Sequence, residues 1–376
     1  MKPWMLYLIG LTLLGLGVYL ALRAHDDAPP NIAFQGSSTE LKQSIVVPTL
    51  NSAIPTGKTV VWCSSFQMAW NRLKSDVIKS PIKVIGAEKI ADDLNASAES
   101  EAEVSPGEYF AAAGFAKDGI VGKIKAGMAE KFPGLRIPEF GADSDVIAFA
   151  CIAAKAKFTA PFHNINDNFA FTDSLGVKTS VSTFGFKYDD YIGSEKLREQ
   201  VQILHYLRDK DAFSLPLEFV VDLSKTSTPN QVVLASVPPK ATLAETLEYV
   251  ETQIKKNDAA EDNEEFKREG ALAVPSMSWY VDHRFSELTG MEKRLGNPGF
   301  GEHYISNAMQ SIDFQFDRTG AEIISKAVVA EKKADKKVSP PWLVFDHPFL
   351  LYLKKRGAAR PFFVMWVDNA ELLSKK

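Results

Sequence analysis

The chain has 376 residues, of which 45% are hydrophobic and 24% are charged, and its formal net charge is −4. This composition is that of an ordinary globular protein and excludes a chain that is disordered over most of its length. The balanced charge provides no basic surface, so we do not expect nucleic acid as a partner. The only two cysteines, Cys63 and Cys151, cannot form a disulfide framework, and their apolar surroundings predict buried free thiols.

Residues 3–22 form an uncharged, mainly apolar run that is long enough to span a bilayer. The following Leu22-Arg23-Ala24 is a poor cleavage site for a signal peptidase, which needs small residues. The sequence therefore predicts a membrane anchor at residues 1–23, with a cleaved signal peptide as the alternative. In the first case the bulk of the chain is membrane-anchored and extracytoplasmic, and in the second it is secreted or periplasmic.

Residues 24–40 contain acidic side chains, two prolines and a Gly-Ser-Ser cluster, which predict a tether. We expect a single folded domain over residues 41–376. Within it, residues 60–70 are typical of an apolar strand that leads into a helix.

The middle of the chain contains several predicted elements. Residues 108–131 have a helical composition, and residues 146–154 form a continuous apolar run that fits a buried strand or a buried helix. Thr242 and Glu245 have the spacing of a capping box, which predicts a helix from Thr242 to about Lys255. The acidic residues 256–267 are interpreted as a solvated linker. Further strands are predicted at residues 179–186, 201–207, 217–222 and 232–239.

No pattern of catalytic residues stands out. Outside residues 3–22 the sequence lacks a nucleophile elbow, a zinc-protease motif and a phosphate-binding glycine loop. None of the histidines has metal-ligand spacing to another histidine or to a cysteine. We therefore expect no metal, no other cofactor and no enzyme activity, unless residues distant in sequence form a site. The histidines are His25, His163, His205, His283, His303 and His347.

The C-terminal quarter has a different pattern. The alternating run Ile312–Phe316 predicts a half-buried strand, and residues 344–353 and 361–367 predict buried strands. Between them lies a polar, lysine-rich segment of roughly 20 residues that ends at Pro340-Pro341. Structureless loops longer than about 12–15 residues are uncommon in compact domains and are usually functional or disordered.

The order of these pieces resembles the C-terminal end of a serpin. Thr319-Gly320-Ala321-Glu322 stands where that family has its hinge, and residues 345–351 and 362–370 stand at its two closing strands. Residues 150–162 and 273–280 are similar to two earlier serpin strands. The resemblance thus extends in order over about residues 140–370.

The resemblance implies a mixed α+β fold with three β-sheets, about nine helices and an exposed reactive-centre loop. It also implies a monomer that inhibits a serine protease as a suicide substrate. The cleaved loop of such an inhibitor inserts into the main sheet as a new strand and traps the protease.

The lysines of the loop predict a trypsin-like target, because such a protease needs a basic residue in its specificity pocket. Counting forward from Gly320 by the family's spacing places the scissile residue near Ala334, whereas counting back from Pro340-Pro341 places it at Lys337. We favour the bond between Lys337 and Val338, followed by bonds after Lys336 or Lys333. A plain solvated lysine run is the alternative interpretation.

The expected hinge runs from Gly320 to Ala327. In an inserted strand alternate residues share a face. Three of the hinge residues, Ile323, Ile324 and Lys326, are bulkier than the alanines that inhibitory members use, and Arg318 replaces their usual Glu. The second hypothesis is therefore a non-inhibitory serpin-fold binding or structural protein tethered to a membrane. One face of the inserted strand would hold Ala321, Ile323, Ser325 and Ala327, and the other Glu322, Ile324, Lys326 and Val328.

Overall fold

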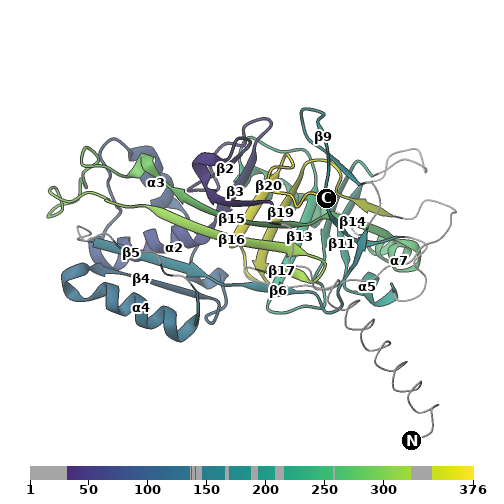
Figure 1. Cartoon of the computed structure of the whole chain (residues 1–376), viewed down its shortest axis with the longest axis horizontal. Helices are drawn as coiled ribbons and strands as arrows, with labels where there is room; N and C mark the ends of the chain where they lie inside the picture. Colours follow the sequence, from purple (N-terminus) through teal and green to yellow (C-terminus); the bar gives the residue numbers. More distant parts are fainter. Residues whose placement is uncertain are drawn as a thin grey trace, which may run out of the picture.

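The computed structural model describes residues 32–322 and 341–376, apart from residues 136, 138–139, 141–145, 166–168, 188–193, 208–215 and 257–258. This part of the chain holds three sheets of four or more strands, two two-stranded ribbons and six α-helices. Figure 1 shows an elongated molecule with α4 (Ile120–Lys131) at one end and α7 (Ala260–Glu269) at the other. The mixed α+β class and the three larger sheets agree with the prediction, and the described residues hold six of the roughly nine helices expected.

The largest sheet has seven strands and contains the two predicted closing strands. These two form an antiparallel hairpin at its centre, in which Leu350 and Val364 are fully buried. In spatial order the strands are β11 (Gln202–Leu207), β12 (Glu218–Asp222), β13 (Asn230–Ser236), β19 (Phe349–Lys355), β20 (Phe363–Val367), β3 (Thr59–Cys63) and β2 (Ser44–Val46).

The second sheet has five strands and includes part of the expected tether. Phe34 packs against the core, and β1 runs parallel to β15 along its edge. Ser38 Oγ lies 2.7 Å from Nδ1 of His283 in β15. The described fold therefore begins before Leu41. In spatial order the strands are β1 (Phe34–Ser37), β15 (Met277–Arg284), β16 (Met309–Asp317), β17 (Gly320–Glu322) and β6 (Lys155–Lys157).

A four-stranded sheet packs against the five-stranded one through aromatic side chains. Phe184 meets Phe316 of β16 edge to face, with ring centroids 5.1 Å apart. The four strands are β18 (Trp342–Val344), β14 (Ala271–Pro275), β10 (Thr183–Phe186) and β7 (His163–Ile165). The two ribbons are β4 (Tyr109–Phe115) with β5 (Val146–Ile152), and β8 (Ala170–Thr172) with β9 (Lys178–Ser180).

Helix α2 (Ser64–Arg72) lies in the interior of the molecule. It follows β3 directly, as the strand-to-helix pattern at residues 60–70 predicts, and all residues from Ser64 to Trp70 are buried. The other helices are α3 (Glu88–Ala96), α5 (Glu195–Glu199) and α6 (Leu243–Lys256). Short 3₁₀ turns occur at Ser38–Glu40, Glu101–Glu103, Ala116–Asp118 and Ser286–Leu288, and a π-helical turn at Leu73–Ile78 follows α2.

The helix predicted over residues 108–131 is wrong in its first half. Residues 109–115 form β4, which pairs antiparallel with β5 from Tyr109 opposite Ile152 to Phe115 opposite Val146. The small side chains of Ala111–Ala113 fit between the core and α4, so that strand pairing overrides helical propensity. The same pairing confirms the strand interpretation of residues 146–154.

The linker predicted at residues 256–267 is also wrong from Ala260 onward, where α7 begins. The acidic side chains misled the prediction, because one buried residue anchors this helix. Phe266 is fully buried against Phe186, with ring centroids 5.8 Å apart. Asn263 adds a polar anchor, since its side chain bonds both the N–H and the carbonyl of Ile203 in β11.

The predicted start of α6 is confirmed at Thr242, with one difference in the cap. Thr242 Oγ1 accepts a hydrogen bond from the backbone N–H of Glu245 at 3.1 Å. The Glu245 carboxylate accepts from the N–H of Ala241, rather than from that of Thr242 as a capping box requires.

Among the described residues, no helix is long and apolar enough to cross a membrane. Residues 3–22, which carry the predicted anchor, lie outside the described part of the chain.

We predict that Phe266→Ala lowers the free energy of unfolding by about 3–5 kcal/mol, the usual cost of removing a buried phenyl ring. Denaturant unfolding measures this change. Glu261→Ala, at an exposed position of the same helix, is the matched control and should have an effect below about 0.5 kcal/mol. Equal, small effects of both substitutions would show that α7 does not depend on Phe266.

Candidate functional site

A tight turn connects β16 to β17. Asp317 Oδ1 accepts hydrogen bonds from both the backbone N–H and the hydroxyl of Thr319, each at 2.7 Å. Such a side-chain-capped turn reverses the chain within a few residues. Gly320 follows with φ +149°, and a Cβ at this position would lie 2.4 Å from the carbonyl oxygen of Ala156. Glycine is therefore required for the chain to approach β6.

Strand β17 is held on both sides. Its three residues pair antiparallel with Gln315–Asp317 of β16 and with Lys155–Lys157 of β6. Ala321 is 1% exposed and lies beside Phe316 in the core. The alternation predicted for the rest of the hinge concerns residues that lie outside the described part of the chain.

Arg318 fastens the turn to the segment after β6. Only 6% of this residue is exposed, and its Nη1 donates to the carbonyl oxygen of Phe162 at 3.2 Å. The backbone adds two further hydrogen bonds, from Phe162 N–H to the Arg318 carbonyl and from Phe158 N–H to the Thr319 carbonyl. Sequence reasoning noted Arg318 only as a departure from the usual Glu, and the tight Asp-Arg-Thr-Gly turn was the signal for its structural role.

The predicted hinge is only partly described by the structure. Gly320, Ala321 and Glu322 form β17. The remaining hinge residues Ile323, Ile324, Ser325, Lys326 and Ala327, and the scissile candidates Lys333, Lys336, Lys337 and Val338, lie outside the described residues.

The chain is described again from Pro341, which lies at a different sheet. The carbonyl of Pro341 accepts from the N–H of Ala271, and β18 then runs parallel to β14. The residues that flank segment 323–340 thus lie at different sheets: Glu322 in the five-stranded sheet and Pro341 beside the four-stranded sheet. Figure 1 shows these two attachment points at β17 and near β14.

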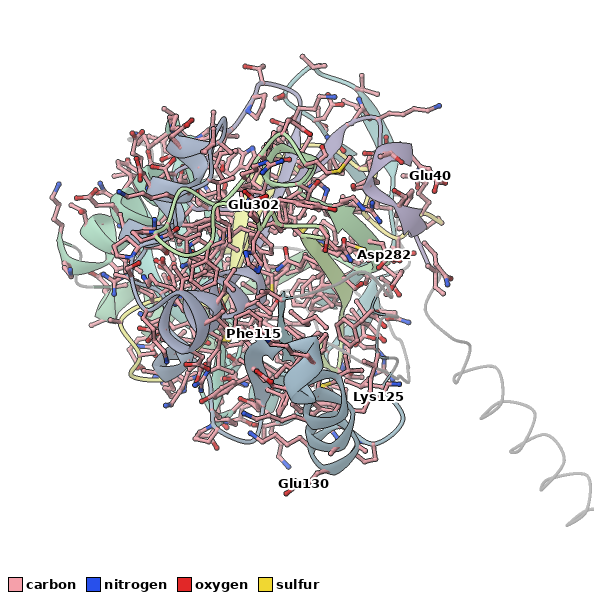
Figure 2. All side chains as sticks on the ribbon, turned by 90° about the vertical axis from the view of Figure 1, so that its left-hand side faces the viewer. Glu40, Phe115, Lys125, Glu130, Asp282 and Glu302 are labelled. Atoms are coloured by element: carbon pink, nitrogen blue, oxygen red, sulfur yellow. The ribbon has the colours of Figure 1, made fainter. Side chains whose placement is uncertain are left out.

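Among the described residues, no strand continues β17 between β16 and β5. The described strands β16 and β5 do not pair with each other, since β16 pairs with β15 and β5 pairs with β4 on their far edges. A cavity of about 360 Å³ lies between them, with walls from β5 and β16, a floor from α2, and one end closed by residues 302–308. Figure 2 looks onto that end, where Glu302 of the closing segment lies above Phe115.

Both cysteines line this cavity and are free. Burial raises the pKa of Cys63, and it raises the pKa of Cys151 to about 12. Thiols with raised pKa values stay protonated at neutral pH and are poor nucleophiles. The prediction of buried free thiols is thus confirmed for Cys63, and Cys151 is partly exposed.

The other perturbed groups do not converge on a catalytic arrangement. Burial lowers the pKa of His283 to about 4 and also lowers the pKa of His205. Partial burial raises the pKa of Asp313, which lines the cavity. Within the described ranges, no group of three or more His, Cys, Asp and Glu side chains could hold a metal ion. The feature that distinguishes this region is therefore the cavity between β5 and β16.

No protein-family model matches this chain, and no curated protein matches its sequence. The crystal structure of the mouse protein-Z dependent protease inhibitor aligns with a TM-score of 0.50 over 83% of this chain and 91% of that chain, at 11% sequence identity. The structure of Serpin48, a highly specific serpin of the insect Tenebrio molitor, aligns with a TM-score of 0.44 over 83% and 92% of the two chains, at 14% identity.

The structure defines a mixed α+β protein in which a hinge-like strand enters an open sheet and a long segment leads from it to a second sheet. The similarity to the mouse inhibitor shows which fold this is. The chain is a divergent protein with the serpin fold, as the order of its C-terminal pieces predicts.

We predict that Gly320→Ala loosens β17, because its Cβ would collide with the Ala156 carbonyl and the backbone would keep an unfavourable φ. The cost should be about 1–3 kcal/mol, and amide hydrogen exchange at Ala321 and Ala156 should accelerate. Gly301→Ala is the control, since a Cβ there meets no heavy atom within 4 Å. Unchanged exchange in the Gly320 variant would contradict the close approach.

Proposed function

We propose that this protein is a serpin-like inhibitor of serine proteases that acts as a suicide substrate. One observation carries the proposal: β17, the first part of the expected hinge, is already paired on both sides at one end of an open sheet. The protein would not be an enzyme, because its role is to be attacked by one. It would need no cofactor and would work as a monomer.

The chemistry of the open edge of β16 supports insertion of the remaining hinge. Gln310, Ile312 and Phe314 are buried, and the alternate residues Met309, Ser311 and Asp313 are exposed. An extension of β17 in its present register would place the inward-facing hinge residues opposite these three: Ile323 opposite Phe314, Ser325 opposite Ile312, and Ala327 opposite Gln310. The three hinge residues are apolar or small, so that the inserted face would suit the cavity.

Insertion would also satisfy backbone groups on two strand edges. Each new backbone hydrogen bond contributes about 0.5–1.5 kcal/mol net, and burial of Ile323 adds roughly 1.5–3 kcal/mol. A native state with an open sheet would therefore be less stable than the inserted state. Such metastability supplies the free energy that an inhibitor of this type needs.

The lysines of the loop support a trypsin-like target. The serine Oγ of the protease would attack the Lys337 carbonyl carbon and form an acyl-enzyme, while the amine of Val338 leaves with a proton from the protease histidine. Insertion of residues 320–327 would then carry the bound protease away before water hydrolyses the ester. Lys336 and Lys333 are the next candidates for the attacked residue.

We also propose that residues 3–22 hold the protein in a membrane, with the folded part outside the cytoplasm. The support is the uncharged run of twenty residues, which is long enough to span a bilayer. The protein should then stay in the membrane pellet after an alkaline carbonate wash. Recovery in the wash would point to the cleaved, secreted or periplasmic form.

A non-inhibitory binding or structural role is the second candidate. The buried Arg318 favours it, because its hydrogen bond to Phe162 fixes the turn in its present form. The bulky Ile324 and Lys326 also favour it, since they would slow insertion. In that case the loop would be cleaved or contacted without entering the sheet.

The decisive experiment incubates the full chain with trypsin and separates the products on a denaturing gel. A band at the sum of the two masses, absent when the protease serine is blocked, is expected. The loop-cleaved chain should melt at least about 10 °C higher than the intact one, because several strand hydrogen bonds are added. Clipping without that band and without stabilisation would favour the binding role.

Two pairs of variants separate the steps. Lys337→Ala should abolish the high-mass band, whereas Lys123→Ala, at an exposed position of α4, should leave it unchanged. Ser325→Glu places a charge on the inward face and should give clipping without the band. Lys326→Glu places the same charge on the outward face and should retain it. Equal behaviour of the two Glu variants would overturn the proposed direction of insertion.

A further inference from the structure

The cavity between β5 and β16 has features of a ligand site in the intact protein. Its volume of about 360 Å³ lies within the range of small-molecule pockets. Phe66 and Trp70 of α2 form its floor together with Leu73 of the following π-helical turn, and Phe149 of β5 contributes to one wall. These side chains suit an apolar ligand body.

Gln310 provides a buried polar group in the same wall. It is 4% exposed, and its Nε2 donates to the Cys63 carbonyl at 2.9 Å and to the Ser65 hydroxyl at 2.8 Å. Its Oε1 has no hydrogen-bond partner among the described residues. A buried amide oxygen without a donor is costly, so that a ligand with an N–H group would gain a hydrogen bond here.

The charged side chains that line the cavity are acidic. Asp313 and Glu302 line it, and the described lining residues include neither lysine nor arginine. Glu302 is paired with Arg294 at 3.2 Å. Asp313, by contrast, makes no ion pair with any described residue, and partial burial raises its pKa. An organic cation would supply the missing partner.

We propose that this cavity binds a small organic amine with an apolar body, whose ammonium group meets Asp313 and whose body lies on Phe66 and Trp70. Aromatic rings within about 6 Å of a cation add to the attraction. The amine would occupy the same space as the inserting hinge and would hold the sheet open. This second part rests on the proposed inhibitory function, whereas the binding itself does not.

The test uses three probes with one body and different head groups: 4-phenylbutylamine, 4-phenylbutan-1-ol and 4-phenylbutanoate. Calorimetric titration of the full chain in lipid nanodiscs, with empty nanodiscs as the blank, measures each affinity. The amine should bind at least tenfold more tightly than the alcohol, and the anion should not bind measurably. Equal affinities for the three, or no binding of the amine, would overturn the proposal.

Asp313→Asn should remove the preference for the amine over the alcohol without affecting the fold, because this position is exposed on its strand. Asp92→Asn, at an exposed position of α3, is the matched control and should keep the preference. Labelling of Cys151 by a maleimide should slow in the presence of the amine, since this thiol lines the cavity. Amine binding that is unaltered by Asp313→Asn would place the probe elsewhere and refute the site.

A final arm separates the ligand site from the proposed function. The loop is cleaved with trypsin, the protease is removed, and the amine is titrated again. Loss of binding would support both a shared cavity and insertion. Binding that persists after cleavage would support the ligand site and count against insertion.

Discussion

The structure depends on the double pairing of a very short strand. At Ala321 the backbone lies between β16 and β6, and this closes the five-stranded sheet at one end only. Gly320 makes the arrangement possible, because no side chain fits against the Ala156 carbonyl. In the described part of the chain, β16 and β5 do not pair with each other, and the backbone groups on their facing edges need water or another strand as partner. Among the described residues, the cleft thus lies between β5 and β16, next to β17.

Helix α2 determines what the cleft can hold. It leaves β3 of the seven-stranded sheet at Cys63 and passes beneath the gap in the five-stranded sheet. Gln310 ties the two parts together through its hydrogen bonds to the Cys63 carbonyl and Ser65. A change in the separation of β16 and β5 must therefore act on the interior helix as well as on the sheet, which links opening of the cleft to the core.

The sequence predicted the parts that depend on local pattern. Alternation of apolar and polar residues identified β16, because a strand with one buried face shows a period of two residues. Continuous apolar runs identified β19 and β20, because such runs are typical of strands that are buried on both faces. The predictions failed where tertiary contacts determine the structure. Residues 109–115 form β4 because β5 pairs with them, and α7 is anchored by the buried Phe266 and by the hydrogen bonds of Asn263 to Ile203. The cavity could not be predicted at all, since Asp313 and Cys151 are far apart in sequence and meet only through the sheet topology.

At 11% identity the similarity to the mouse inhibitor reaches the fold and no further, so that function must be inferred from the cleft itself. The cleft combines two properties that favour different occupants. Its buried strand residues Ile312 and Phe314 suit an added strand, whereas the carboxylate of Asp313 suits a cation. Only one occupant fits the space at a time. The proposed mechanism requires the sheet to stay open until the loop is cleaved. A ligand that fills the cleft would stabilise this open state, because any species that binds only to one state stabilises that state.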